Sequence, residues 1–129
     1  MHINVSLPPS EFVDRFLVFR IRVRKLKNKK PAVAKHANKW VATHRAIFKQ
    51  IIAVIDNDSM TVKELAAIHE ELWLLEDRVR APSRENNSQF QNDARLIFQL
   101  NDRRHQLKLR IDEACGVALT GIRIYAAQK

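Results

Sequence analysis

The most constraining feature of this chain is a series of long apolar stripes with helical spacing, interrupted by very few glycines and prolines. The sequence of 129 residues contains only 2 Gly and 4 Pro. From Phe12 onward the apolar residues Phe16, Phe19, Val23 and Leu26 follow at alternating intervals of four and three. This spacing places them on one face of an α-helix, so the chain is expected to consist mainly of packed helices.

The few prolines and glycines, together with helix-capping residues, divide the chain into four expected helices. Pro9 precedes the first stripe, Pro31 suits the first position of a helix, and Gly116 suits the left-handed residue that ends one. Two pairs resemble helix-capping boxes: Thr61 with Glu64, and Ser88 with Gln91. We therefore expect helices over residues 10–28, 31–55, 61–81 and 88–115.

The two ends of the chain have a different pattern. Val5 and Leu7 alternate with polar residues, and Ile122 and Ile124 flank Arg123. A period of two is typical of β-strands. The two segments could pair with each other, pair with a second copy of the chain, or remain unpaired, because an isolated two-stranded ribbon is marginally stable.

These patterns favour an all-α fold, which is an antiparallel bundle of about four helices. Short β segments could be added to it at both termini. One helical domain is expected over residues 1–129. Apolar residues off the main stripes are Leu17, Val41, Phe48, Ile52, Trp73 and Phe98. Either the four helices enclose all of them, or some form an interface between copies of the chain, and we expect a homo-oligomer.

Positive charge is concentrated in the first half of the chain. Between Asp14 and Asp56 there is no acidic residue, and the same stretch holds twelve Lys or Arg. Residues 1–60 carry twelve basic and four acidic residues, a net +8, whereas residues 61–129 carry eleven and ten, a net +1. A run of one sign repels itself, so this imbalance indicates an anionic partner.

Eight of these basic residues are expected to form the binding surface, near the end of the first helix and the start of the second. They are Arg22, Arg24, Lys25, Lys27, Lys29, Lys30, Lys35 and Lys39. Nucleic-acid phosphates would supply the counter-charge, and binding would be largely independent of base sequence. The alternative is a charged face that only keeps the protein soluble, with lysine stems lying over the apolar stripe.

A second polar group lies on the third and fourth expected helices. It consists of Glu76, Asp77, Asn101, Arg103, Arg104 and Lys108. If the two helices run antiparallel, these residues can meet where the helices cross. Such a mixed-sign cluster can fix helix register as a structural network, or it can form a pocket for a small anion.

No catalytic residue, cofactor or metal site is predicted. The five histidines lack the spacing of zinc ligands, and Cys115 is the single cysteine, which rules out an internal disulfide. Cys115 is expected to be a packed thiol. The sequence contains no Gly-rich phosphate loop and no nucleophile motif.

The expected location is the cytoplasm. No apolar run reaches the roughly 18 to 20 residues that a transmembrane helix needs, and the N-terminus lacks the pattern of a secretory signal. A single cysteine also suits a reducing compartment.

Two polar blocks resemble a known family. They are Leu72-Trp73-Leu74-Leu75-Glu76-Asp77-Arg78-Val79-Arg80 and Asn101-Asp102-Arg103-Arg104, with Lys108 and Ile111 downstream. They are similar to the LW-x-(I/L)-ED and ND-x-R blocks of an uncharacterised bacterial and phage family of small helical proteins, a domain of unknown function. The start Glu11-Phe12-Val13-Asp14-Arg15 is also similar, whereas Arg20 stands where that family usually has glutamate. The resemblance implies a helical fold and no particular chemistry.

The sequence therefore predicts a non-enzymatic, basic helical module that binds an anionic partner, with nucleic acid or a nucleic-acid-associated complex as the first hypothesis. A phage-type regulator that docks on an acidic host protein is the alternative. A small helical-bundle enzyme for an anionic metabolite is a second alternative, with Arg103, Arg104 and Lys108 facing Glu76. A membrane-surface role for the basic first helix is a further alternative.

Overall fold

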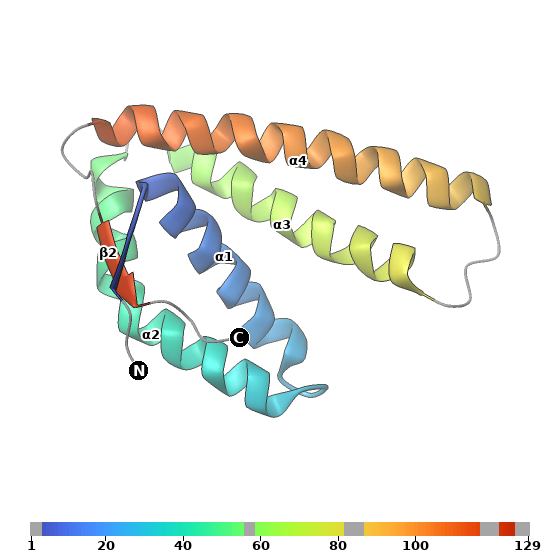
Figure 1. Cartoon of the computed structure of the whole chain (residues 1–129), viewed down its shortest axis with the longest axis horizontal. Coiled ribbons are helices and arrows are strands. Elements are labelled where there is room, and N and C mark those ends of the chain that lie inside the picture. Colours follow the sequence, from blue (N-terminus) through green and yellow to red (C-terminus); the bar gives the residue numbers. More distant parts are fainter. Residues whose placement is uncertain (1–3, 56–58, 82–86, 117–121, 126–129) are drawn as a thin grey trace.

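Long helices make up most of the described chain, as the apolar stripes predicted (Figure 1). The computed structural model describes residues 4–55, 59–81, 87–116 and 122–125. The elements are β1 (Asn4–Leu7), α1 (Pro9–Leu26), α2 (Pro31–Val54), α3 (Ser59–Arg80), α4 (Asn87–Cys115) and β2 (Ile122–Tyr125). The all-α bundle predicted from the sequence is confirmed.

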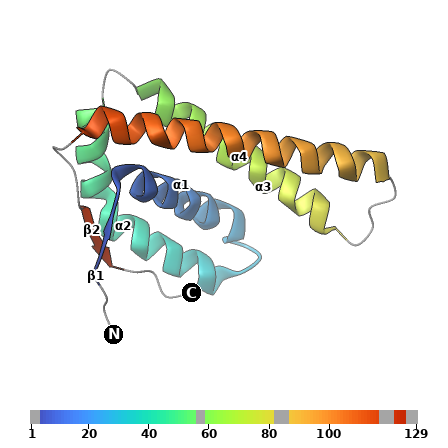
Figure 2. The same cartoon turned by 45° about the horizontal axis from the view of Figure 1, so that its top comes forward.

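The helices form two antiparallel hairpins, α1 with α2 and α3 with α4. α1 lies between α2 and the second hairpin, and α3 and α4 run side by side past the end of α1 (Figures 1 and 2). α1 packs most extensively on α2 and also contacts both α3 and α4. The first helix is therefore the element that joins the two hairpins.

The period-two segments at the two ends pair with each other. β1 and β2 are antiparallel, with Val5 opposite Ile124 and Leu7 opposite Ile122. The ribbon lies beside α2 in both views (Figures 1 and 2). Leu7 packs against the helical core, which supplies the support that an isolated ribbon lacks.

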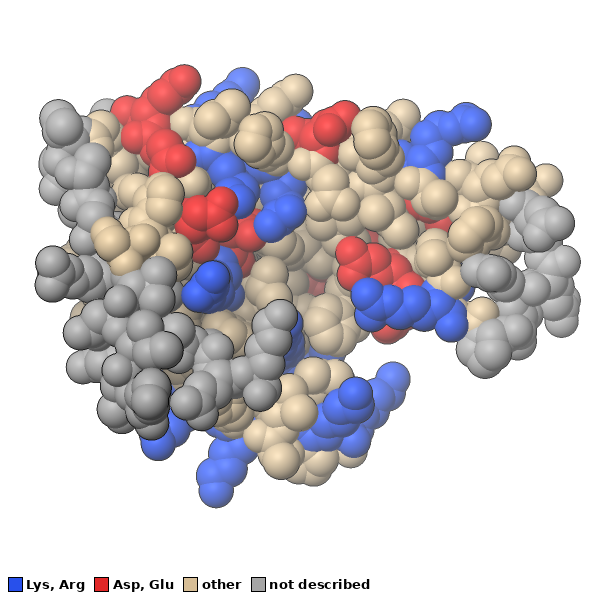
Figure 3. Space-filling view, in the orientation of Figure 1, with Lys and Arg blue, Asp and Glu red and all other residues tan. Residues whose placement is uncertain are grey.

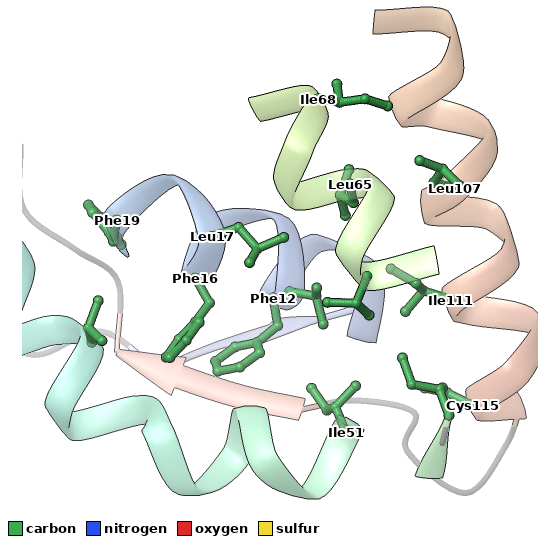
Figure 4. Close-up of a cluster of buried hydrophobic side chains, with 14 of the residues drawn as sticks. Phe12, Phe16, Leu17, Phe19, Ile51, Leu65, Ile68, Leu107, Ile111 and Cys115 are labelled. Carbon is green, nitrogen blue, oxygen red and sulfur yellow. The ribbon is translucent and has the colours of Figure 1, made fainter. Parts of the chain in front are cut away.

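The core forms where the hairpins meet (Figure 4). Phe12 of α1, Leu65 of α3 and Leu107 of α4 are completely buried, and Ile111 and Ile51 are 1% exposed. Phe12 belongs to the apolar stripe that was predicted for the first helix. Burying side chains of this size contributes about 1.5–3 kcal/mol each to stability.

Aromatic rings fill the contact between α1 and α2. The Phe16 and Phe48 rings stack with their centroids 4.1 Å apart, and the Phe19 and Trp40 rings lie 4.5 Å apart. His44, which is 3% exposed, continues this group with its ring 4.2 Å from that of Trp40. The His44 Nδ1 donates to the Trp40 carbonyl at 2.8 Å, so this histidine is a hydrogen-bonded core residue.

The start of α1 differs from the sequence prediction. The helix begins at Pro9, one residue before the predicted start, so Ser10 lies within the first turn. The Ser10 backbone N–H and hydroxyl donate to the Asp112 carboxylate of α4, at 2.9 and 2.7 Å. A carboxylate from another helix thus satisfies a free N–H at the positive end of α1.

The other helix ends are predicted to within two residues. α3 begins two residues before Thr61, and the capping box predicted there is wrong because Glu64 accepts hydrogen bonds from Arg103 instead. Gly116 follows α4 with φ +53°, the left-handed conformation that was predicted to end the helix.

The four helices do not enclose all of the apolar residues that lie off the stripes. Leu17 and Val41 are buried, but Phe98 is 68% exposed, and Leu74 on the neighbouring helix is 56% exposed. The α3–α4 hairpin therefore presents apolar side chains on its surface. None of the described helices combines the length and apolarity that a membrane crossing requires.

Candidate functional site

Five of the eight predicted anion-binding residues form an exposed group at the turn between α1 and α2. They are Lys27, Lys29, Lys30, Lys35 and Lys39, which we call the basic corner. The turn itself is held by a hydrogen bond from the Lys30 N–H to the Leu26 carbonyl at 2.8 Å. Within the described residues, none of the five lysines has a carboxylate partner.

The other three predicted residues have partners inside the protein. Arg24 forms an ion pair with Glu70 of α3, and the Lys25 Nζ lies 3.8 Å from the same carboxylate. The Arg22 guanidinium lies over the Phe19 ring, 5.0 Å from its centroid. α3 therefore supplies a carboxylate to two of the eight residues, and an aromatic ring of α1 lies against a third.

The surface shows the charge separation that the sequence indicated. In Figure 3, Lys and Arg side chains without Asp or Glu beside them project along the lower edge, over α2 and the α1–α2 turn, and other Lys and Arg side chains lie among the acidic ones over α3 and α4. Most of the Asp and Glu side chains in that view lie over α3 and α4. The first turn of α2 contains no acidic residue, so its positive dipole end adds to the field of the lysines.

A groove adjoins the ion pair of Arg24. It has a volume of about 380 Å³, and its lining comes from α1, α2 and α3. Leu17, Ile21 and Val41 form its apolar base, and Ala66 lies on the α3 wall. We call it the arginine groove, because three arginines line it: Arg20, Arg24 and Arg45.

Two of these arginines, Arg20 and Arg45, were not among the predicted site residues. Both belong to the acid-free stretch, but their joint position requires α1 and α2 to pack side by side, which the sequence does not specify. The Arg20 guanidinium lies 6.0 and 5.9 Å from the ring centroids of Phe16 and Phe48, at the junction of the two helices. Among the described residues, neither Arg20 nor Arg45 has a carboxylate partner.

A separate buried polar cluster is centred on Asp14, a residue that the sequence analysis did not select. Its Oδ1 accepts from Arg104 Nε at 2.8 Å and from His69 Nε2 at 2.6 Å, and its Oδ2 accepts from Arg104 Nη2 at 2.5 Å. Arg104 also donates to the Asn101 side-chain oxygen at 3.4 Å. The cluster thus joins α1, α3 and α4.

The cluster keeps Asp14 ionised in the interior. Burial by itself would raise the pKa of this carboxyl, but the hydrogen bonds from Arg104 and His69 outweigh burial and hold the pKa well below its usual range. The same contact raises the pKa of Arg104. Because an ionised carboxylate only accepts hydrogen bonds, the His69 Nε2 must carry the donated proton.

The remaining residues of the predicted polar network have other partners. Lys108 forms an ion pair with Glu11 of α1, and Arg103 donates to Glu64 at 2.5 and 3.0 Å. Glu76 lies 3.9 Å from Arg80 on its own helix and contributes only a long-range charge effect at Arg104. The expected pairing of Glu76 and Asp77 with Arg103 and Arg104 is therefore wrong. Arg103 pairs with Glu64, and Arg104 pairs with Asp14.

α1 and α4 are joined by a ladder of polar contacts. Its three pairs are Ser10 with Asp112, Glu11 with Lys108, and Asp14 with Arg104. The α4 members recur every four residues and so lie on one helix face. The three contacts therefore fix the position of α1 along α4, and so the register between the two hairpins.

Cys115 is a buried thiol near the end of α4. Cys115 is 3% exposed, and burial together with the charge of Asp112 raises the pKa of its thiol, which disfavours the reactive thiolate. Within the described ranges, no three His, Cys, Asp or Glu side chains converge as metal ligands would.

Comparison with known proteins gives no match to a family model, a curated protein or a solved structure.

Proposed function

We propose that this protein is a non-enzymatic binding module whose basic corner binds the phosphates of nucleic acid. The observation that carries the proposal is the cluster of five exposed lysines at the α1–α2 turn without a carboxylate partner among the described residues. Lysine acts as a compact, mobile point charge, which suits contact with a phosphate backbone.

The position of the lysines supports binding without base recognition. They lie at a helix–helix turn and on the first three turns of α2, and the sequence contains no groove-reading helix motif. Phosphate contacts of this kind set position and affinity but do not discriminate between sequences. Counterion release would supply much of the binding free energy.

The test is fluorescence anisotropy with a labelled DNA duplex and a labelled single-stranded RNA, at about 50 mM salt, where phosphate contacts are strong. The corner variant carries Lys27→Gln, Lys29→Gln and Lys30→Gln. The matched control carries Lys63→Gln, Arg95→Gln and Arg110→Gln, which remove the same charge from exposed positions on α3 and α4. The proposal requires a much larger loss of affinity in the corner variant than in the control.

A further inference from the structure

We propose that the arginine groove docks an acidic amphipathic helix of a partner protein. The groove is distinct from the basic corner, and the inference does not rest on nucleic-acid binding. Its base consists of α1 residues together with Val41 of α2, and further residues of α2 and α3 supply the two walls. The lining spans residues 17–24 of α1 and 38–45 of α2, a length on the order of 10 Å at the rise of an α-helix.

The base of the groove suits an apolar side of a ligand. Leu17, Ile21 and Val41 present aliphatic side chains there, and Ala66 and Ala67 keep the α3 wall low. Small wall residues allow a docked helix to approach closely. Two turns of helix with apolar residues at positions i, i+3 or i+4, and i+7 would cover this base, which is the common mode of helix-in-groove recognition.

The rim of the groove selects acidic residues. Arg20 and Arg45 stand on α1 and α2 without a carboxylate partner among the described residues. Arg20 is held over the Phe16 and Phe48 rings, so little side-chain freedom is lost when it binds. A planar guanidinium also matches a carboxylate in two parallel hydrogen bonds.

The carboxylate of Glu70 makes the groove more suitable for an acidic helix than for nucleic acid. Glu70 lines the groove and forms an ion pair with Arg24, so the positive charge of Arg24 is already compensated and the α3 wall offers an approaching anion no net attraction. A continuous phosphate backbone would bring its charges close to this carboxylate. A helix with two or three acidic residues on one flank can place them at Arg20 and Arg45 and direct neutral residues towards Glu70.

The test uses the full chain and a fluorescein-labelled designed peptide of about 14 residues, near the length at which isolated helices begin to form. Leucines recur on one face of the peptide, with glutamates on both flanks. A second peptide has lysine in place of every glutamate. Anisotropy is measured at about 0.15 M salt, where distant surface charges are screened. The proposal requires binding of the glutamate peptide and not of the lysine peptide.

Three variants locate the binding site. Arg20→Gln with Arg45→Gln should weaken peptide binding by about tenfold or more, the loss expected for a close charged contact. Lys29→Gln with Lys30→Gln removes the same charge from the basic corner and should change the affinity less than about twofold. Ala67→Trp keeps the charge but fills the groove from an exposed position, and should also weaken binding about tenfold.

Circular dichroism confirms that each variant is folded, and Arg45→Gln alone replaces the double variant if loss of Arg20 disturbs the aromatic stack. Equal loss in the groove and corner variants would overturn the proposal, as would unchanged binding in Ala67→Trp or no binding by the wild-type chain. If the groove variant loses affinity for duplex DNA but keeps it for the peptide, the groove is part of a nucleic-acid site and the proposal is also wrong.

Discussion

Arg104 of α4 and Asp14 of α1 form a two-bond ion pair at the junction of the two hairpins, with Nε–Oδ1 and Nη2–Oδ2 distances of 2.8 and 2.5 Å. The side chain of Asp14 is 8% exposed and that of Arg104 is 31% exposed. The pair is therefore asymmetric, because the arginine can reach water if its partner is removed and the aspartate cannot.

This asymmetry predicts unequal effects of removing each partner. Arg104→Met should lower the free energy of unfolding by about 3–5 kcal/mol, because it leaves a buried carboxylate without its main partner. Asp14→Asn should cost less, about 1–3 kcal/mol, because Arg104 can turn to solvent and the amide still accepts hydrogen bonds. Urea unfolding measures both values.

The neighbouring Arg103 provides the control for this comparison. Its bond to Glu64 lies on the surface, where ion pairs contribute little to stability. Arg103→Gln should leave the unfolding midpoint nearly unchanged. An effect as large as that of Arg104→Met would show that charge on α4, and not the buried pair, controls stability.

Asp14 should also govern acid unfolding. Its pKa is lowered in the folded state, so its contribution to stability is complete above the unfolded pKa of about 3.9 and is lost as pH falls through the lower folded value. The free energy of unfolding should therefore fall steeply below about pH 5, and Asp14→Asn should flatten this dependence. Glu64→Gln is the control, because that carboxylate is exposed. Parallel pH profiles for Asp14→Asn and the wild type would contradict this role.

The contact between Ser10 and Asp112 should contribute about as much to the free energy of unfolding as a helix cap does. Ser10→Ala removes the hydroxyl bond and keeps the backbone N–H bond to Asp112, so we expect a loss of about 1 kcal/mol. Asp112→Asn weakens both contacts and should cost more. If Ser10→Ala is the more harmful of the two, the hydroxyl has a role outside this contact. Thermal melting followed by circular dichroism distinguishes the two results.

Apolar residues on the α3–α4 hairpin are the expected sites of self-association, which remains a prediction. Phe98 is 68% exposed and Leu74 is 56% exposed. Light scattering at tens of micromolar protein should give a mass above 15.0 kDa, the mass of one chain. Phe98→Ser should reduce it towards that value. A wild-type chain that is monomeric at this concentration would exclude the oligomer.

Helices and core residues were predictable because each depends on a local pattern. The stripe from Phe12 to Val23 and the left-handed Gly116 specify their own structure through spacing and backbone preference. The buried polar cluster was not predictable in the same way. Asp14 lies 55 residues from His69 and 90 from Arg104 along the chain, so only the crossing of three helices brings them together.

The sign of the surface charge on α1 and α2 was predictable, but the ion pairs that these basic residues form were not. The acid-free stretch indicated a positive surface, yet Glu70 of α3 neutralises part of it at Arg24. No pattern in the sequence indicates this contact, because Glu70 follows the apolar Ile68 by two residues and so lies on nearly the opposite side of the helix. Which arginine it meets depends on the packing of α1 against α3. The resemblance of the polar blocks to a phage and bacterial family remains a prediction.

The salt dependence of nucleic-acid binding tests the central proposal most directly. For the wild-type chain, log affinity for duplex DNA should fall linearly with log salt, with a slope of about −0.9 for each phosphate neutralised. Lys27→Gln, Lys29→Gln and Lys30→Gln together should flatten this slope and weaken all DNA sequences alike, while Lys63→Gln, Arg95→Gln and Arg110→Gln together should leave it unchanged. A wild-type chain that does not bind at about 50 mM salt, or a slope that the corner variant leaves unchanged, would contradict the proposed function.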